Sequence, residues 1–292
     1  MDEEFGGWLA GTWNGLYQSQ DGIDWSHVDG YTYRVTSIAR EDGRICVGVG
    51  SGLWEVSRGS EIWVQLHDET LTEVLDLMYA PGDPGVVAAS AYGVGRSFRE
   101  GSDVVRWSWP SDYESVNDRF TNSIEIDSAD PTRWIAGTEN GVRIGEESGS
   151  KWISSTLIGT PVRSVRRIAD TWWAGSDGQG VWKSANGVEW EQAGTGLDGE
   201  TVFSVADCSG KVLLGTETGV AVGDGVGKWE NVGPQARVAS VAADSKNPRR
   251  WMAGCSPGGL WVTEDAGKGW RYIAGMEMNS VEAILAPGGH RS

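Results

Sequence analysis

Arginines recur at corresponding places along this sequence, and they are well suited to binding an anion. Each stands just before or within a short segment that contains serine and a branched residue. The set comprises Arg34, Arg119, Arg163 and Arg237, with Arg166 and Arg167 a little further along. A guanidinium can bind a carboxylate or a phosphate through two parallel hydrogen bonds. Acidic residues occur in neighbouring segments, at Glu73, Glu139, Glu200, Glu217 and Glu277. Structural salt bridges are therefore the alternative to anion binding.

Aromatic residues accompany these arginines and are expected to be exposed near them. They are Trp13, Tyr31, Tyr33, Tyr92, Trp109 and Tyr113. Such side chains stack on sugar rings or anchor a protein partner. Packing inside the fold is the alternative. The segment 108–122 is the longest departure from the repeat described below, and insertions in repeat proteins commonly form binding surfaces.

Other arrangements with catalytic or metal-binding potential are sparse. Glu139 and Asp177 are a possible carboxylate pair for general acid/base chemistry, which requires a separation of roughly 5 to 10 Å. The histidines, His27, His67 and His290, stand apart from any serine or cysteine motif. The cysteines, Cys46, Cys208 and Cys255, show no CxxC spacing and are expected to be small buried residues. No metal, cofactor, disulfide or catalytic triad is predicted.

Charge and hydropathy exclude some kinds of partner. The 292 residues carry a formal charge of −17, from 41 acidic and 24 basic residues, which disfavours nonspecific binding to nucleic acid or to anionic membranes. Only six of the basic residues are lysine, a composition similar to that of proteins from salt-loving archaea. No apolar run approaches the roughly 20 residues of a membrane span, and the acidic start lacks a signal-peptide core. We expect a cytoplasmic monomer of a salt-adapted organism.

A repeat of about 40 residues organises the whole chain. Residues 8–17 align with residues 45–54, and the pattern restarts at Val86, Trp134, Trp172, Val212 and Trp251. In each copy an apolar strand runs into a turn and then into a glycine that begins a second strand. These glycines are Gly15, Gly52, Gly93, Gly141, Gly180, Gly219 and Gly259. The spacing predicts seven four-stranded antiparallel blades of an all-β propeller, in one domain that spans residues 1–292.

The second strand of each copy ends in a turn that a tryptophan closes. The clearest turns are residues 19–25, 184–190, 223–229 and 263–270. A short polar side chain can satisfy turn N–H groups, glycine supplies positive φ, and tryptophan covers the hairpin end. These turns resemble the Asp box, S-x-D-x-G-x-x-W, of sialidases, sortilin-type receptors and photosystem II assembly-factor propellers. The residues that carry this resemblance are Ser19, Asp21, Trp25, Ser184, Asn186, Trp190, Asp265 and Trp270.

The resemblance implies a structural role for these turns and places any active site on the opposite face. Sialidases use three arginines, a tyrosine nucleophile and a carboxylic acid/base. This chain lacks the (F/Y)-R-I-P motif that supplies the first arginine, so sialidase activity is not expected. Photosystem assembly-factor propellers also present an arginine patch.

A short strand that opens on serine plus a branched residue is expected to be innermost in each blade. It is found at Ser37-Ile38, Ser123-Ile124, Ser164-Val165, Ser204-Val205, Ser240-Val241 and Ser280-Val281, and Val74-Leu75 fills the seventh place. Because the chain begins at a second strand, residues 280–286 should complete the first blade and close the ring. The expected function is non-catalytic binding of a partner protein or an anionic ligand, and a carbohydrate-active hydrolase or lyase is the alternative.

Overall fold

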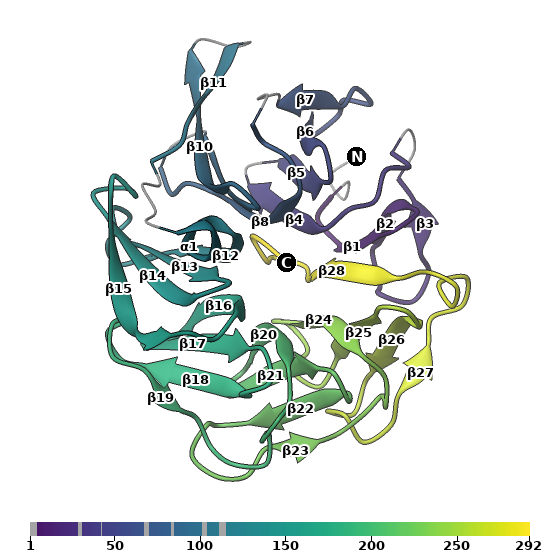
Figure 1. The fold of residues 1–292 in the computed structure, drawn as a ribbon. Coiled ribbons are helices and arrows are strands. Elements are labelled where there is room, and N and C mark those ends of the chain that lie inside the picture. Colours follow the sequence, from purple (N-terminus) through teal and green to yellow (C-terminus); the bar gives the residue numbers. More distant parts are fainter. Residues whose placement is uncertain are drawn as a thin grey trace.

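Seven four-stranded antiparallel sheets surround a central channel in the computed structural model, as the repeat predicts (Figure 1). The structure describes residues 5–28, 31–41, 43–66, 70–82, 85–100, 104–110 and 115–292. Each sheet is one blade, and its strands follow one another from the channel to the rim. The predicted fold, a seven-bladed all-β propeller, is confirmed.

The strands of the first four blades are as follows, from the innermost outward. Blade 1 contains β28 (Val281–Leu285), β1 (Trp8–Thr12), β2 (Gly15–Ser19) and β3 (Ser26–His27). Blade 2 contains β4 (Ser37–Glu41), β5 (Arg44–Val49), β6 (Gly52–Ser57) and β7 (Val64–Leu66). Blade 3 contains β8 (Val74–Tyr79), β9 (Val86–Ser90), β10 (Gly93–Glu100) and β11 (Val104–Ser108). Blade 4 contains β12 (Thr121–Ile126), β13 (Trp134–Thr138), β14 (Gly141–Glu146) and β15 (Lys151–Ile158).

Three blades complete the ring. Blade 5 contains β16 (Val162–Ile168), β17 (Thr171–Ser176), β18 (Val181–Ser184) and β19 (Glu191–Gln192). Blade 6 contains β20 (Val202–Cys208), β21 (Lys211–Thr216), β22 (Val220–Gly223) and β23 (Glu230–Asn231). Blade 7 contains β24 (Val238–Ala243), β25 (Trp251–Cys255), β26 (Gly259–Thr263) and β27 (Arg271–Tyr272). A four-residue helix, α1 (Val116–Arg119), precedes blade 4.

Ring closure follows the prediction as well. β28 pairs with β1 in an antiparallel register that sets Leu285 opposite Leu9 and Ala283 opposite Gly11. The strand nearest the C-terminus is thereby the innermost strand of the blade that holds the N-terminal strands (Figure 1). This pairing removes the exposed sheet edge that an unclosed ring would present.

The hairpin glycines have the backbone conformation that the repeat requires. Gly141 has φ of +117°, and a Cβ atom there would lie 2.1 Å from the main-chain oxygen of Leu157 in the outer strand. Glycine therefore supplies both the turn and the close approach of the outer strand.

The tryptophan-closed turns are built by local hydrogen bonds. Asp21 Oδ1 accepts the N–H groups of Ile23 and Asp24 at 2.8 and 2.9 Å, and Ser19 Oγ accepts the N–H of Gly22 at 2.8 Å. Ser184 and Asn186 make the equivalent bonds in blade 5, and Thr263 and Asp265 make similar ones in blade 7. The closing indoles are also anchored: Trp190 donates to Gly187, and Trp270 donates to Val232 of the preceding blade. The Trp25 indole covers its turn without a hydrogen-bond partner.

The core is divided among the seams between blades. Seven buried apolar clusters occur in the described residues, one in each seam. Tryptophans of the second strands supply much of the buried volume, because Trp8, Trp134 and Trp172 are each only 1% exposed. Each blade is therefore stabilised by contact with its neighbours rather than by a core of its own.

Serine hydroxyls join the innermost strands of neighbouring blades. Ser123 Oγ accepts the N–H of Val165 at 3.1 Å, and Ser240 Oγ accepts the N–H of Ile284 at 3.0 Å. The sequence prediction related these serines to limited space near the axis. The structure adds that the hydroxyls of Ser123, Ser204 and Ser240 each satisfy a main-chain donor in the adjacent blade. The hydroxyl of Ser37 is buried without a hydrogen-bond partner.

Two of the seven predicted serine positions are wrong. The position in blade 3 belongs to Asp76, whose Oδ2 accepts the N–H of Ile124 at 3.0 Å, and not to Val74-Leu75. The position in blade 1 belongs to Ala283, opposite Gly11, and not to Ser280. The register shift between Val74 and Asp76 recurs in blades 4 to 7, so Asp76 occupies the place that serine has there. A pattern based on serine does not show this position because the residue is aspartate.

Topology gives the ring two distinct faces. We call the face where the innermost strands begin the loop face; it also carries the turns before the hairpin glycines. We call the opposite face the box face, because it carries the tryptophan-closed turns. Arg34, Arg119, Arg163 and Arg237 lie on the loop face, because each stands at or before the start of an innermost strand. Arg166 and Arg167 lie further along β16, toward the box face.

Candidate functional site

A groove of about 490 Å³ opens on the loop face between the loops that precede β4 and β8. Its lining residues are Tyr33, Arg34, Thr36, Val49, Gly50, Ser51, Thr72, Glu73 and Leu75. Two of the residues predicted to bind a ligand, Tyr33 and Arg34, therefore lie side by side in one cavity. Glu73, expected as a possible salt-bridge partner, also lines the groove.

Arg34 is held in place by an aromatic ring and one carboxylate. Its guanidinium carbon lies 4.9 Å from the centre of the Trp13 ring, and Nη2 lies 3.9 Å from Glu282 Oε2. Trp13 Nε1 donates to the other oxygen of Glu282 at 2.6 Å. At 3.9 Å the ion pair is long, and 51% of the arginine side chain is exposed. Most of its N–H donors thus remain available for an anion.

Tyr33 forms an aromatic wall next to Arg34. Its ring stacks on Trp54 with an interplanar angle of 12°, and 58% of the residue is exposed. Trp13 is similarly exposed at 55%. Exposed tyrosine, tryptophan and arginine side chains close together are a combination that protein interfaces favour.

Tyr31 differs from the prediction. It is 1% exposed, with its ring centre 4.4 Å from that of Trp63 and its edge toward Tyr33. Burial raises the pKa of its hydroxyl far above the usual range. Tyr31 supports Tyr33 from beneath, so the expectation of an exposed side chain is wrong.

Arg163 is engaged in salt bridges. Nη1 lies 2.7 Å from Glu139 Oε1, and Nη2 bonds Asp177. The hydrogen bond from Arg163, aided by one from Thr201, lowers the pKa of Asp177. Glu139 and Asp177 therefore share one cation, and a general acid would need the opposite shift in pKa.

The remaining predicted residues do not line the groove. Arg237 lies over Phe203, with its guanidinium carbon 4.4 Å from the ring centre, and Nε lies 3.7 Å from Glu217. Arg119 is exposed at the end of α1, and Tyr92 is 59% exposed in blade 3. Trp109 is half-buried and packs against the seam of blades 2 and 3. Tyr113 and His67 lie outside the described residues.

Glu282, which pairs with Arg34 and accepts a hydrogen bond from Trp13, is the residue of the site that sequence reasoning missed. It lies in β28, and its Oε1 also accepts a hydrogen bond from Ser256 at 2.8 Å. The sequence did place residues 280–286 in blade 1, which also holds Trp13. The serine position predicted for that strand was wrong, however, so the sequence did not show where Glu282 lies along it.

No group of three potential metal ligands occurs among the residues that the structure describes. Within the same residues, no helix is long and apolar enough to cross a membrane.

Similarity to known proteins lies in the fold. Neither a known family's sequence profile nor a curated protein sequence matches the chain. The extracellular domain of a putative hybrid two-component system of B. thetaiotaomicron has a TM-score of 0.67 and 15% identity, covering 94% of this chain and 36% of its own. An ancestral GH74 enzyme has a TM-score of 0.65 and 17% identity, covering 82% and 38%. A computationally designed protein, Ika8, has a TM-score of 0.59 and 12% identity, covering 84% and 76%.

The chain spans somewhat more than a third of the first two of these proteins. At such identities the similarity shows a shared propeller fold, and function has to be argued from the site.

Proposed function

We propose that this protein is a non-catalytic binding propeller of the Asp-box type, and that its loop-face groove binds a carboxylate-bearing segment of a partner protein. The observation that carries the proposal is the state of Arg34: oriented by Trp13, half exposed, and only distantly paired with Glu282. A carboxylate that entered the groove would meet a pre-oriented guanidinium, and Tyr33 would cover an adjacent apolar side chain.

Catalysis is less well supported. The carboxylate pair that a hydrolase or lyase would use, Glu139 and Asp177, is bound to Arg163, and the pKa of Asp177 is lowered. This environment favours an ionised carboxylate over a proton donor.

The Asp-box assignment rests on the turns of blades 1, 5 and 7, in which a short polar residue accepts successive N–H groups below a tryptophan. Composition supports the accompanying proposals of a monomer in the cytoplasm of a salt-adapted organism. A formal charge of −17 opposes self-association in dilute salt.

Selection of random peptides displayed on phage tests the groove. Wild-type protein, the groove variant Y33A/R34A and a control variant R271A/Y272A would be immobilised in parallel. The control removes an arginine and a tyrosine of comparable exposure from β27, on the rim of blade 7. We expect selected peptides that contain Asp or Glu, and a loss of about tenfold or more in affinity for Y33A/R34A, equivalent to roughly 1.4 kcal/mol. Binding to the control variant should be unchanged. Recovery of no peptide, or of peptides that bind Y33A/R34A equally well, would refute the proposal.

A further inference from the structure

The segment 287–292, which we call the tail, turns back from β28 into the central channel (Figure 1). It runs along the innermost strand of blade 2. The N–H of Arg40 donates to His290 O at 2.7 Å, and the N–H of Ser292 donates to Ile38 O at 2.9 Å. The Arg40 guanidinium fixes the bend before it, donating to the main-chain oxygens of Ala286 and Gly289 at 2.6 and 3.1 Å.

The tail also supplies a hydroxyl that blade 1 lacks, because Ala283 stands where most innermost strands have serine. Ala283 of blade 1 has no hydroxyl to accept the N–H of Ile38 in blade 2. Ser292 Oγ accepts that N–H instead, at 3.0 Å. The tail is therefore docked at a defined place in the channel.

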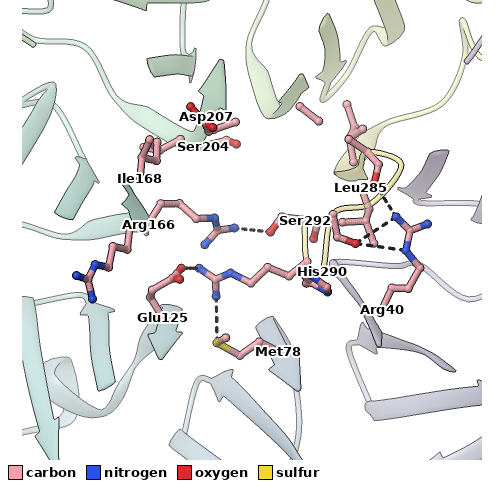
Figure 2. A pocket seen from close by; sticks show the side chains of 18 of the residues that line it. Arg40, Met78, Glu125, Arg166, Ile168, Ser204, Asp207, Leu285, His290 and Ser292 are labelled. Carbon is pink, nitrogen blue, oxygen red and sulfur yellow. Dashed lines mark hydrogen bonds and ion pairs between the residues drawn. The ribbon is translucent and has the colours of Figure 1, made fainter. Parts of the chain in front are cut away.

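From this position Arg291 places its guanidinium between blades 3, 4 and 5. Its acceptors are Asp76 Oδ2 at 3.3 Å, the main-chain oxygen of Val165 at 3.0 Å, the main-chain oxygen of Ile124, and Glu125 Oε2. The sulfur of Met78 lies 3.8 Å away. Figure 2 shows Glu125 and Met78 on one side of the channel, where they receive this side chain. We call the four oxygen acceptors the guanidinium site.

The guanidinium site is buried and contains two carboxylates, and Arg166 Nη1 approaches the same Asp76 oxygen at the longer distance of 3.5 Å. The side chains of Asp76 and Arg291 are 7% and 8% exposed. Asp76 also accepts hydrogen bonds from Ser123 and Ile124, so its carboxylate is fixed in orientation. Burial raises the pKa of Glu125, and the positive charge of Arg291 opposes that rise. Two carboxylates and two carbonyls arranged around a planar fork suit a guanidinium better than an ammonium ion, which is a compact charge.

A cavity of about 630 Å³ lies next to the tail, toward the box face of the channel. Small and apolar residues such as Ala206, Ala242 and Leu285 line it together with the polar residues Arg166, Arg291 and Ser292. Figure 2 shows Arg166 and Ser292 extending into the space between the innermost strands. Small-molecule sites in proteins commonly have this size and this mixture of apolar walls with a few convergent polar groups. The cavity thus gives a ligand both a path and room beside the guanidinium site.

We infer that the channel is a binding site for a guanidinium-bearing ligand, such as an arginine side chain, and that Arg291 of this chain occupies it as an internal ligand. The apolar wall of the cavity receives the remainder of the ligand when the tail is displaced. The cavity beside the tail and the loop-face groove have no lining residue in common, and neither proposal depends on the other.

Chemical rescue of R291A tests the inference. The probe is N-ethylguanidinium, followed by calorimetric titration and by thermal melting. We expect one molecule to bind per chain and to raise the melting temperature of R291A. At a concentration about ten times the dissociation constant, mass action shifts the folding equilibrium by roughly elevenfold. Wild-type protein and R271A, which lacks an exposed arginine of β27, should show no such stabilisation because Arg291 fills their site.

Two comparisons identify the chemistry. Ethylammonium carries the same charge without the planar fork and should rescue R291A far less. The double variant R291A/E125Q should lose most of the binding. Absence of binding to R291A, equal rescue by ethylammonium, or unchanged binding to the double variant would overturn the inference.

If R291A does not fold in buffer, the wild-type protein provides the test. Nα-acetyl-arginine amide, at concentrations well above those that would rescue R291A, should compete with the tethered Arg291, displace the tail and accelerate hydrogen exchange at the amides of Arg40 and Ser292, which bond along the tail. The corresponding lysine amide is the control. Unchanged exchange at both amides would overturn the inference.

Discussion

Substitution of Ser240 by alanine should destabilise the ring although it removes only one oxygen atom. Ser240 is 4% exposed, and its hydroxyl accepts the N–H of Ile284 at 3.0 Å across the seam between blades 7 and 1. In S240A the N–H of Ile284 loses its acceptor and stays buried. An unsatisfied buried donor costs about 1–3 kcal/mol. In domains of 150–250 residues each kcal/mol lowers the melting temperature by roughly 2–4 °C.

S280A is the matched control for S240A. Ser280 is the serine that the sequence pattern places in the series, but Ala283 occupies that position in the structure. Removing the hydroxyl of Ser280 should therefore change the free energy of unfolding by less than about 0.5 kcal/mol. Thermal melting and urea titration of both variants provide the measurement. Equal losses in S240A and S280A, or no loss in S240A, would refute the role given to the inter-blade hydroxyls.

Three further predictions concern backbone geometry, thiol reactivity and salt. G141A should be more destabilising than G178A in thermal melting. Both glycines have positive φ, which costs about 1–2 kcal/mol for alanine, but only at Gly141 does the new Cβ meet a main-chain oxygen. The three cysteines should react slowly with dithionitrobenzoate at pH 8 and fully after unfolding. The reason is that burial raises the pKa of Cys208 to about 11 and that of Cys255 to about 12, and also raises the pKa of Cys46. Rapid labelling of the native protein would contradict this prediction. The melting temperature should rise between dilute buffer and KCl at about 1 M. The formal charge is −17, and salt at that concentration screens the repulsion between charges within roughly 3 Å. An unchanged melting temperature would count against salt adaptation.

The blades were predictable because their signals are local. Gly141 needs positive φ whatever surrounds it, and Asp21 bonds N–H groups two and three residues away. Such requirements are written into each repeat, so seven repeats could be counted and the closing strand inferred.

The interactions within the candidate site were less accessible, because they depend on how different blades meet. Tyr31 and Tyr33 are two residues apart, yet one is buried under Trp63 and the other is exposed on Trp54. Salt bridges were predicted as an alternative for the arginines, and Arg163 does form them. Its second partner, Asp177, lies in the turn after β17, and the sequence did not show that this turn reaches Arg163. The channel site was missed because nothing in the repeat indicates that Arg291 turns inward.

Pairing between β1 and β28 also affects how the nascent chain folds. Leu9 finds its partner, Leu285, only after more than 250 further residues have been made. At about 5–20 residues per second, the ribosome takes on the order of 15–55 s to supply that strand. During this interval the inner edge of blade 1 has exposed main-chain donors and acceptors, which can pair with other chains. Efficient production of the protein therefore depends on keeping this edge from other nascent chains until synthesis reaches β28.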